Sequence, residues 1–154
     1  MATMNWRRVL ALLPAVLLAQ AAWAQSITRT ADLSFGAFTA GSGGTVAVAA
    51  SGLRTRTGGV ILVNQGGSAS AAQFNVSGTG GAVVILTLPA DGTVTLSDGS
   101  HTMALNTFVS SPVGLGTLSG GGTLSFSVGA TLSVGASQPP GSYSGVFSVT
   151  VVYQ

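Results

Sequence analysis

The chain has 154 residues, no cysteine and only 5% charged residues, with a formal net charge of +2. Arg7 and Arg8 account for that charge, because beyond residue 24 three arginines balance three aspartates. Residues 25–154 therefore have almost no net charge and lack the basic surface that binds nucleic acid, so no nucleic-acid partner is expected. Without disulfides, the stability of an exported chain has to come from packing and strand pairing.

Residues 1–24 have the pattern of a cleaved export signal. Two arginines form a basic start, an apolar stretch follows, and Ala22-Trp23-Ala24 is a small-x-small cleavage site. The apolar stretch is shorter than the roughly 20 residues that cross a bilayer, so we expect no stable membrane anchor in the mature form. The sequence therefore predicts one mature domain, residues 25–154, that passes through the periplasm to the cell surface.

Short apolar runs with a period of two recur along residues 25–154, each bounded by glycine-rich stretches. Successive side chains of a strand point to opposite faces, so this alternation predicts half-buried β-strands, and no window shows a helical period. The recurring β-branched and aromatic residues argue against disorder. In chain order, strands are expected within residues 32–38, 45–49, 59–63, 72–78, 82–89, 93–97, 101–108, 123–134 and 141–154.

Asp98-Gly99 stands between two alternating runs and is the strongest turn signal of the chain. It predicts a hairpin with a two-residue type I′ turn, because glycine reaches positive φ without a steric penalty. A second turn signal, Asp91-Gly92, lies upstream. Together the two turns predict a three-strand meander over residues 82–108.

Residues that support catalysis are scarce, since the chain has one histidine and no cysteine, glutamate or lysine. Ser100, His101 and Asp98 are close in sequence, but a catalytic triad usually gathers its members from separate segments. We interpret His101 as an exposed residue beside the hairpin turn. No cluster of metal ligands is visible either, so neither an enzyme nor a cofactor is predicted.

Arg54 and Arg56 project to the same side if the segment that contains them is extended. They are suited to meet an acidic polysaccharide or a carboxylate of a partner. The preferred interpretation is that they are charges on an edge strand, where they discourage pairing with other chains.

The C-terminal stretch GSYSGVFSVTVVYQ, residues 141–154, alternates between a mainly apolar and a mainly hydroxylated set of side chains. This pattern predicts a half-buried strand at the end of the chain. Its apolar set raises the question of what covers it. The set consists of Tyr143, Gly145, Phe147, Val149, Val151 and Tyr153.

Gly141 is the fourteenth residue from the end and the aromatic Tyr153 is the penultimate one. This ending resembles the C-terminal signature of bacterial pilus subunits that are assembled by the chaperone–usher route. Residues 33–48, 71–89 and 128–153 also resemble pilin-like exported domains of unassigned function, of the DUF4402 type. Leu33, Phe35 and Gly36 carry that wider resemblance near the start of the domain.

The resemblance implies an immunoglobulin-like, pilin-type antiparallel β-sandwich that lacks one strand. A periplasmic chaperone, and later another pilus subunit or a second copy, would supply the strand beside the tail after delivery to an outer-membrane usher. The implied interface consists of Gly141, Tyr143, Gly145, Phe147, Val149, Val151 and Tyr153. The possible donor segment contributes Ile27, Ala31, Leu33 and Phe35, although Arg29 stands where an apolar donor residue is expected.

Two functions from different classes follow. The first is a structural fimbrial subunit on the bacterial surface, assembled by donor-strand complementation without catalysis. The second is a self-contained secreted binding module for a surface glycan or protein, in which residues 141–154 are an ordinary internal strand. The sequence has enough candidate strands to complete its own sandwich, so both interpretations stay open.

Overall fold

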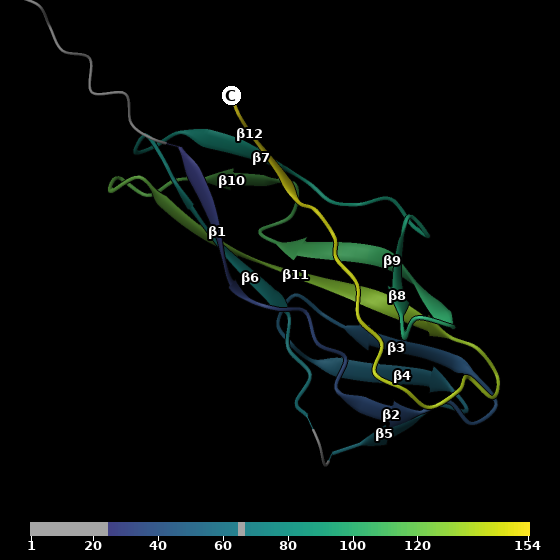
Figure 1. Ribbon diagram of the computed structural model, residues 1–154. Helices are drawn as coiled ribbons and strands as arrows, with labels where there is room; N and C mark the ends of the chain where they lie inside the picture. Colours follow the sequence, from purple (N-terminus) through teal and green to yellow (C-terminus); the bar gives the residue numbers. More distant parts are fainter. Residues whose placement is uncertain (1–24, 65–66) are drawn as a thin grey trace, which may run out of the picture.

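The computed structural model describes residues 25–64 and 67–154, and the predicted export signal lies outside them. This part of the chain consists of strands and connections, and every strand pair is antiparallel. The predicted fold class, an all-β antiparallel β-sandwich, is confirmed (Figure 1). Within the described residues, no helix has the length and apolar character needed to span a bilayer.

The larger of the sheets has seven strands and is organised around one long central strand. Its members are β1 (Ser26–Ala31), β3 (Gly44–Val48), β4 (Arg54–Gly58), β6 (Ala72–Ser77), β8 (Val94–Ser97), β9 (Thr102–Ser111) and β11 (Thr123–Val134). The first half of β11 pairs with β6 and its second half with β3, while β9 pairs with the other edge. β1 and β4 extend the sheet beyond β6 and β3.

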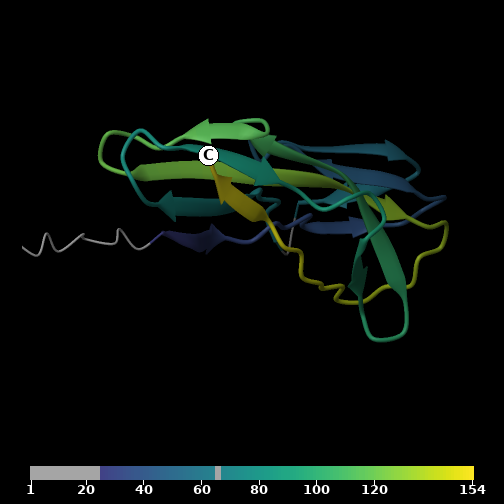
Figure 2. The ribbon, with the colours of Figure 1, turned by 90° about the horizontal axis from the view of Figure 1, so that it is seen from above.

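A small sheet packs on the large one. It consists of β10 (Leu115–Thr117), β7 (Val83–Thr87) and β12 (Thr150–Tyr153), in that order. A separate two-stranded ribbon is formed by β2 (Ala37–Thr39) and β5 (Ile61–Val63). Figure 2 shows the C-terminal residues on one side of the central strands of the large sheet, with the β8–β9 hairpin projecting toward the same side.

Two buried clusters hold the layers together. In the first, Val46, Leu132 and Leu105 form a register row across β3, β11 and β9, and each is at most 1% exposed. The second cluster lies between the small sheet and the β6–β11 end of the large sheet, around Val84 and Phe126. Burial of each such aliphatic side chain contributes roughly 1.5–3 kcal/mol, which suits a domain without disulfides.

The predicted meander over residues 82–108 is wrong. β8 and β9 pair as expected, but β7 belongs to the small sheet. The reason is the core that each strand serves, because Val84 and Leu86 pack in the second cluster whereas Leu96 packs on the first. The connection after β7 therefore carries the chain from one layer to the other.

The hairpin at Asp98-Gly99 is confirmed, but its two-residue turn is not. Ser97 pairs with Thr102, the Asp98 N–H donates to the carbonyl oxygen of His101 at 3.2 Å, and only Gly99 has positive φ. The Asp98 carboxylate accepts backbone N–H groups two and three residues further on. This local capping favours a turn centred on Gly99 and Ser100, in which the aspartate stays outside the left-handed region.

Candidate functional site: an open groove beside the C-terminal tail

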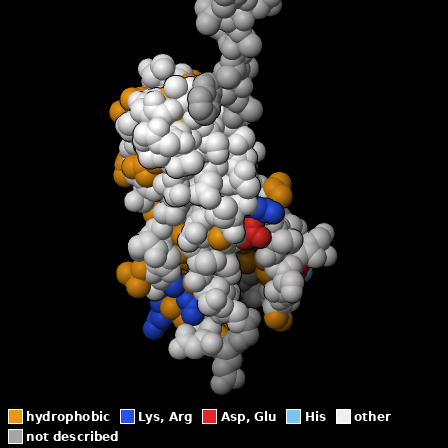
Figure 3. All heavy atoms as spheres, turned by 90° about the vertical axis from the view of Figure 1, so that its left-hand side faces the viewer, with side chains coloured by type: hydrophobic (Ala, Val, Ile, Leu, Met, Phe, Trp, Pro, Cys, Tyr) orange, Lys and Arg blue, Asp and Glu red, His pale blue; other side chains and the backbone are white. Residues whose placement is uncertain are grey.

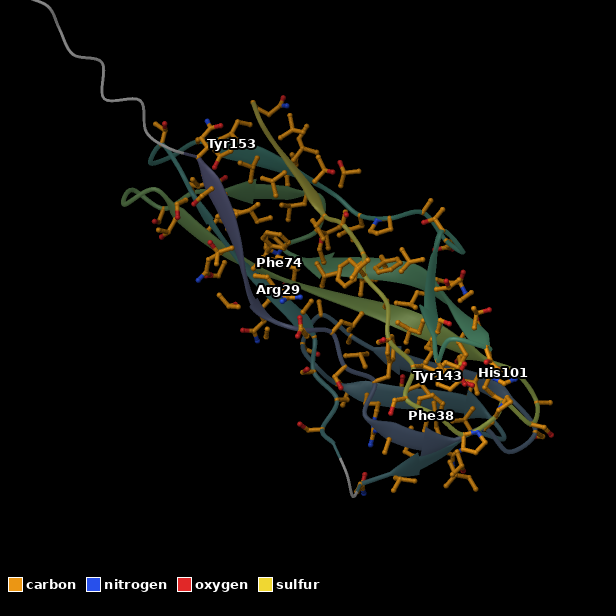
Figure 4. All side chains as sticks on the ribbon, viewed as in Figure 1. Arg29, Phe38, Phe74, His101, Tyr143 and Tyr153 are labelled. Carbon is orange, nitrogen blue, oxygen red and sulfur yellow. The ribbon has the colours of Figure 1, made fainter. Side chains whose placement is uncertain are left out.

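A cavity of about 1060 Å³ lies between the N-terminal part of the domain, the large sheet and the start of the C-terminal tail. We call it the groove. One wall is formed by residues 32–41, the N-terminal wall, and the other by residues 137–147. Its floor comes from the large sheet and is apolar, with Phe74, Leu96, Met103, Leu105 and Leu132 contributing. In Figure 4, Phe38 and Tyr143 lie close together, and Phe74 lies beside Arg29, away from them.

The tail, residues 141–154, changes its partner along the groove. Ser144 exchanges two backbone hydrogen bonds with Ser97 of β8, at 2.8 and 3.0 Å, and from Thr150 onward the tail pairs with β7 as strand β12. Between these points, residues 145–149 pair with no strand in the described part of the chain. The expected terminal strand is thus present only over Thr150–Tyr153.

Two of the predicted interface residues shape the start of the tail. The Tyr143 hydroxyl donates to the carbonyl oxygen of Pro139 at 2.8 Å and accepts from the Gln138 amide at 3.1 Å. A Cβ built on Gly145 would overlap the carbonyl oxygen of Thr95. Gly145 therefore allows the tail to cross β8 at close range, before the chain runs on unpaired.

Phe147 lies over an aromatic cluster and lines the groove. Its ring is 6.4 Å from Phe74, edge to face, and 5.4 Å from Phe108, and Phe74 stacks on Phe126 at 5.0 Å. Val149, Val151 and Tyr153 also point inward and pack against the second cluster. The side chains of Phe147, Val149, Val151 and Tyr153 remain half-buried. The apolar face predicted for the tail is real, but it is only partly covered.

The possible donor segment is divided between two environments. Ile27 and Ala31 lie on β1, which pairs with β6 of the same molecule and leaves Ile27 45% exposed. Leu33 packs against both clusters, and Phe35 is buried in the first. Only residues 26–31 are therefore held mainly by backbone pairing.

Arg54 has a role that the sequence did not suggest. It begins β4, a strand with β3 as its one partner among the described strands, and its guanidinium reaches the N-terminal wall. There it donates to the carbonyl oxygens of Phe35 at 3.0 Å and Ala37 at 3.2 Å. Arg56 is exposed and donates only to Gly58 of its own strand. The interpretation as edge-strand charges suits Arg56 but not Arg54.

Comparison with known proteins gives a family. A family model described as "Domain of unknown function (DUF4402)" matches residues 26–153. The chain belongs to the DUF4402 family. No curated protein and no solved structure matches it. The matched range covers both walls of the groove, so the site lies entirely within the DUF4402 domain.

The lining of the groove in this DUF4402 domain carries a single pair of charges. Arg29 and Asp32 form an ion pair of 2.8 Å, with both side chains largely exposed, and the other described lining residues are uncharged. Figure 3 shows neighbouring positive and negative side chains beside a hollow in which hydrophobic side chains are visible. An uncharged apolar slot suits apolar side chains rather than an ionic ligand.

Ser100, His101 and Asp98 form a capped turn at the tip of the β8–β9 hairpin. The backbone N–H groups of Ser100 and His101 donate to the Asp98 carboxylate and lower its pKa to about 2. The His101 ring lies 3.1 Å from the same carboxylate. Among the described residues, no group of three or more histidine, aspartate or glutamate side chains is placed to hold a metal ion.

Proposed function

We propose that this DUF4402 domain is a structural subunit of a pilus-like surface fibre, in which a β-strand from another polypeptide occupies the groove. One observation carries the proposal: residues 145–149 pair with no strand in the described part of the chain, and residues 145–147 line a cavity with an apolar floor. Backbone N–H and C=O groups need partners when they are removed from water. An added strand supplies those hydrogen bonds, and its alternate side chains fill the apolar space.

The lining indicates the chemistry of the donor. Because the floor is apolar and the lining is uncharged apart from the Arg29–Asp32 pair, we expect the donor to present apolar residues at most alternate positions. The proposed order of partners begins with a periplasmic chaperone, continues at an outer-membrane usher and ends with the next subunit. Export to the cell surface is part of the same proposal, and neither catalysis nor a cofactor is involved.

The proposed donor in the fibre is the N-terminal segment of a second copy, whose alternating set is apolar at Ile27 and Ala31 but charged at Arg29. β1 is attached to β6 by its backbone, while five of its six side chains are exposed. Transfer of β1 to a neighbouring groove therefore costs little side-chain packing and exchanges one set of main-chain hydrogen bonds for another. Phe35 stays behind, because it belongs to the core of its own molecule.

Hydrogen exchange on residues 25–154 tests the proposal. A synthetic peptide with the sequence of residues 25–33 is added, and a second peptide carries the change Arg29→Val. We expect both peptides to slow amide exchange at residues 145–149, the second at lower concentration, and a scrambled peptide to have no effect. Co-expression with a periplasmic chaperone of the pilus type should raise the soluble yield.

Two results would contradict the proposal. The first is strong protection of amides 145–149 in the free, monomeric protein. The second is a cooperative fold whose exchange no peptide with alternating apolar residues alters. Either result would favour the self-contained binding module, in which residues 141–154 complete the sandwich without a partner.

A further inference from the structure

The N-terminal wall of the groove has little regular pairing at its start. Ser34 and Ser70 exchange backbone hydrogen bonds of 2.8 and 2.9 Å, and the Ser70 hydroxyl donates to the carbonyl oxygen of Asp32 at 2.9 Å. Further along, the wall becomes β2, whose partner is the equally short β5. A three-residue ribbon has too few hydrogen bonds to be stable alone. The position of this wall therefore depends on what attaches the ribbon to the sheet.

Phe35 and Phe38 of this wall pack in the first cluster, and Arg54 adds a polar attachment to the backbone. Besides Phe35 and Ala37, its guanidinium donates to the carbonyl oxygen of Val63 at 3.4 Å and to the side-chain oxygen of Asn64 at 3.3 Å. One side chain thus joins the wall, the end of β5 and the edge of the large sheet. All four acceptors are neutral, so the planar fork of donors, rather than an ion pair, makes the connection.

Gly36 leaves the space that the guanidinium occupies. The residue has φ +66°, and a Cβ built on it would lie 2.5 Å from Arg54 Nη1. The carbonyl groups on either side, those of Phe35 and Ala37, are the two that accept from this nitrogen. The turn at Gly36 and the arginine therefore form one unit, although Gly36 precedes β2, Arg54 begins β4 and the two are far apart in sequence.

We propose that Arg54 is the positioning residue of the groove. Its guanidinium holds the Phe35–Ala37 backbone against the edge of the large sheet and so keeps the N-terminal wall apart from the tail while the groove is empty. This role rests on the proposed function, because it prepares the space that a donor strand enters. A wall held in place before binding lowers the ordering cost of complex formation.

The test compares Arg54→Lys with Arg56→Lys, a matched change two residues away on the same strand. Lysine keeps the charge, but its single ammonium group cannot bridge the acceptors that the guanidinium joins. In the free protein, we expect Arg54→Lys to speed amide exchange at residues 33–38 about tenfold and to weaken binding of the 25–33 peptide about tenfold, as for a loss of one or two net hydrogen bonds. Arg56→Lys should change neither quantity by more than about twofold.

A milder variant keeps the test decisive if Arg54→Lys does not fold. Asn64→Ala removes one of the four acceptors, from an exposed side chain, and should raise exchange at residues 33–38 by a smaller factor. Unchanged exchange in the folded variants would overturn the positioning role. Faster amide exchange at residues 33–38 with unchanged peptide affinity would show that the position of the wall does not affect strand binding. That result would overturn the proposal as well.

The proposed function can fail independently. If the wild-type protein bound no donor peptide, the strand-acceptor role would be wrong. Exchange at residues 33–38 would still show whether Arg54 positions the wall.

Discussion

The hydroxyl of Tyr153 donates a hydrogen bond to the carbonyl oxygen of Ser77 at 2.9 Å. Tyr153 lies on β12 of the small sheet and Ser77 ends β6 of the large one, so this bond joins the two layers. In Figure 4, Tyr153 lies at the β12 end of the molecule, away from Tyr143. The penultimate aromatic residue thus has a structural role in the subunit itself, whatever strand later joins the tail.

Replacement of Tyr153 by phenylalanine tests that role. The change removes the hydroxyl but keeps the ring, so we expect a loss of about 0.5–1.5 kcal/mol in the free energy of unfolding, measured by denaturant titration. Val152→Ala is the control, because Val152 faces outward and makes no such bond. Equal losses in the two variants would mean that the hydrogen bond does not contribute.

The path of the tail past β8 gives a second prediction. Alanine at Gly145 would overlap the Thr95 carbonyl oxygen, which belongs to the backbone and cannot move aside as a side chain would. We expect Gly145→Ala to separate the Ser97–Ser144 bridge and to speed amide exchange at these two serines at least tenfold.

Gly120→Ala is the matched control for this substitution, because a Cβ at Gly120 meets no atom within 4 Å. Its expected effect on exchange at Ser97 and Ser144 is less than about twofold. Protection that stays intact in Gly145→Ala would show that the tail reaches β8 without the close approach.

The tail shows how far sequence reasoning extends in this domain. Its alternation is a local property, and the inward set from Phe147 to Tyr153 is the set that a period of two predicts. Periodicity assigns residues to faces, but it does not say which strands become neighbours. This is why residues 82–108 read as one meander although β7 joins a different sheet, and why the unpaired residues 145–149 were not foreseen.

Arg54 shows a second limit of prediction from the sequence, which concerns long-range contacts. Its principal acceptors lie 19 and 17 residues away in sequence, so no short motif connects them with the arginine. The available signal was Gly36 within LSFG, which indicates a backbone turn but does not reveal what fills the space beside it. The strand pattern predicts which floor residues face inward, whereas no local pattern predicts a contact of this kind in a wall.

The ion pair at the rim of the groove leads to a third prediction. Arg29 and Asp32 are both largely exposed, so their pair contributes only about 0–1 kcal/mol to stability. Arg29→Val and Asp32→Asn should therefore unfold at nearly the same denaturant concentration as the wild type. If the N-terminal segment is the donor, Arg29→Val alone improves it and shifts the protein toward oligomers in sedimentation experiments.

The two variants lose the same ion pair, which makes Asp32→Asn the control for Arg29→Val. Equal self-association of both would assign the effect to the lost pair rather than to a better donor strand. Absence of self-association in both would count against residues 26–31 as the donor, while a donor from another protein would remain compatible with the groove.

The turn of the β8–β9 hairpin yields a prediction about acid stability. The pKa of Asp98 is lowered from 3.8 to about 2 in the folded state, chiefly by the backbone N–H groups of Ser100 and His101. A lowered carboxyl pKa stabilises the fold at pH values above the unfolded pKa, and this contribution is lost as the pH falls toward 2. Asp98→Asn should be less stable than the wild type at pH 7, with a difference that shrinks between about pH 4 and pH 2.

His101→Gln distinguishes the backbone from the imidazole as the cause. The substitution keeps both backbone N–H donors to Asp98 and removes only the ring. The backbone hydrogen bonds are the largest contributors to the low pKa of Asp98. The free energy of unfolding of this variant should therefore fall between pH 4 and pH 2 nearly as much as that of the wild type. Denaturant titrations at several pH values measure the effect. If His101→Gln and Asp98→Asn gave the same pH dependence, the ring rather than the turn backbone would be what stabilises the charged carboxylate.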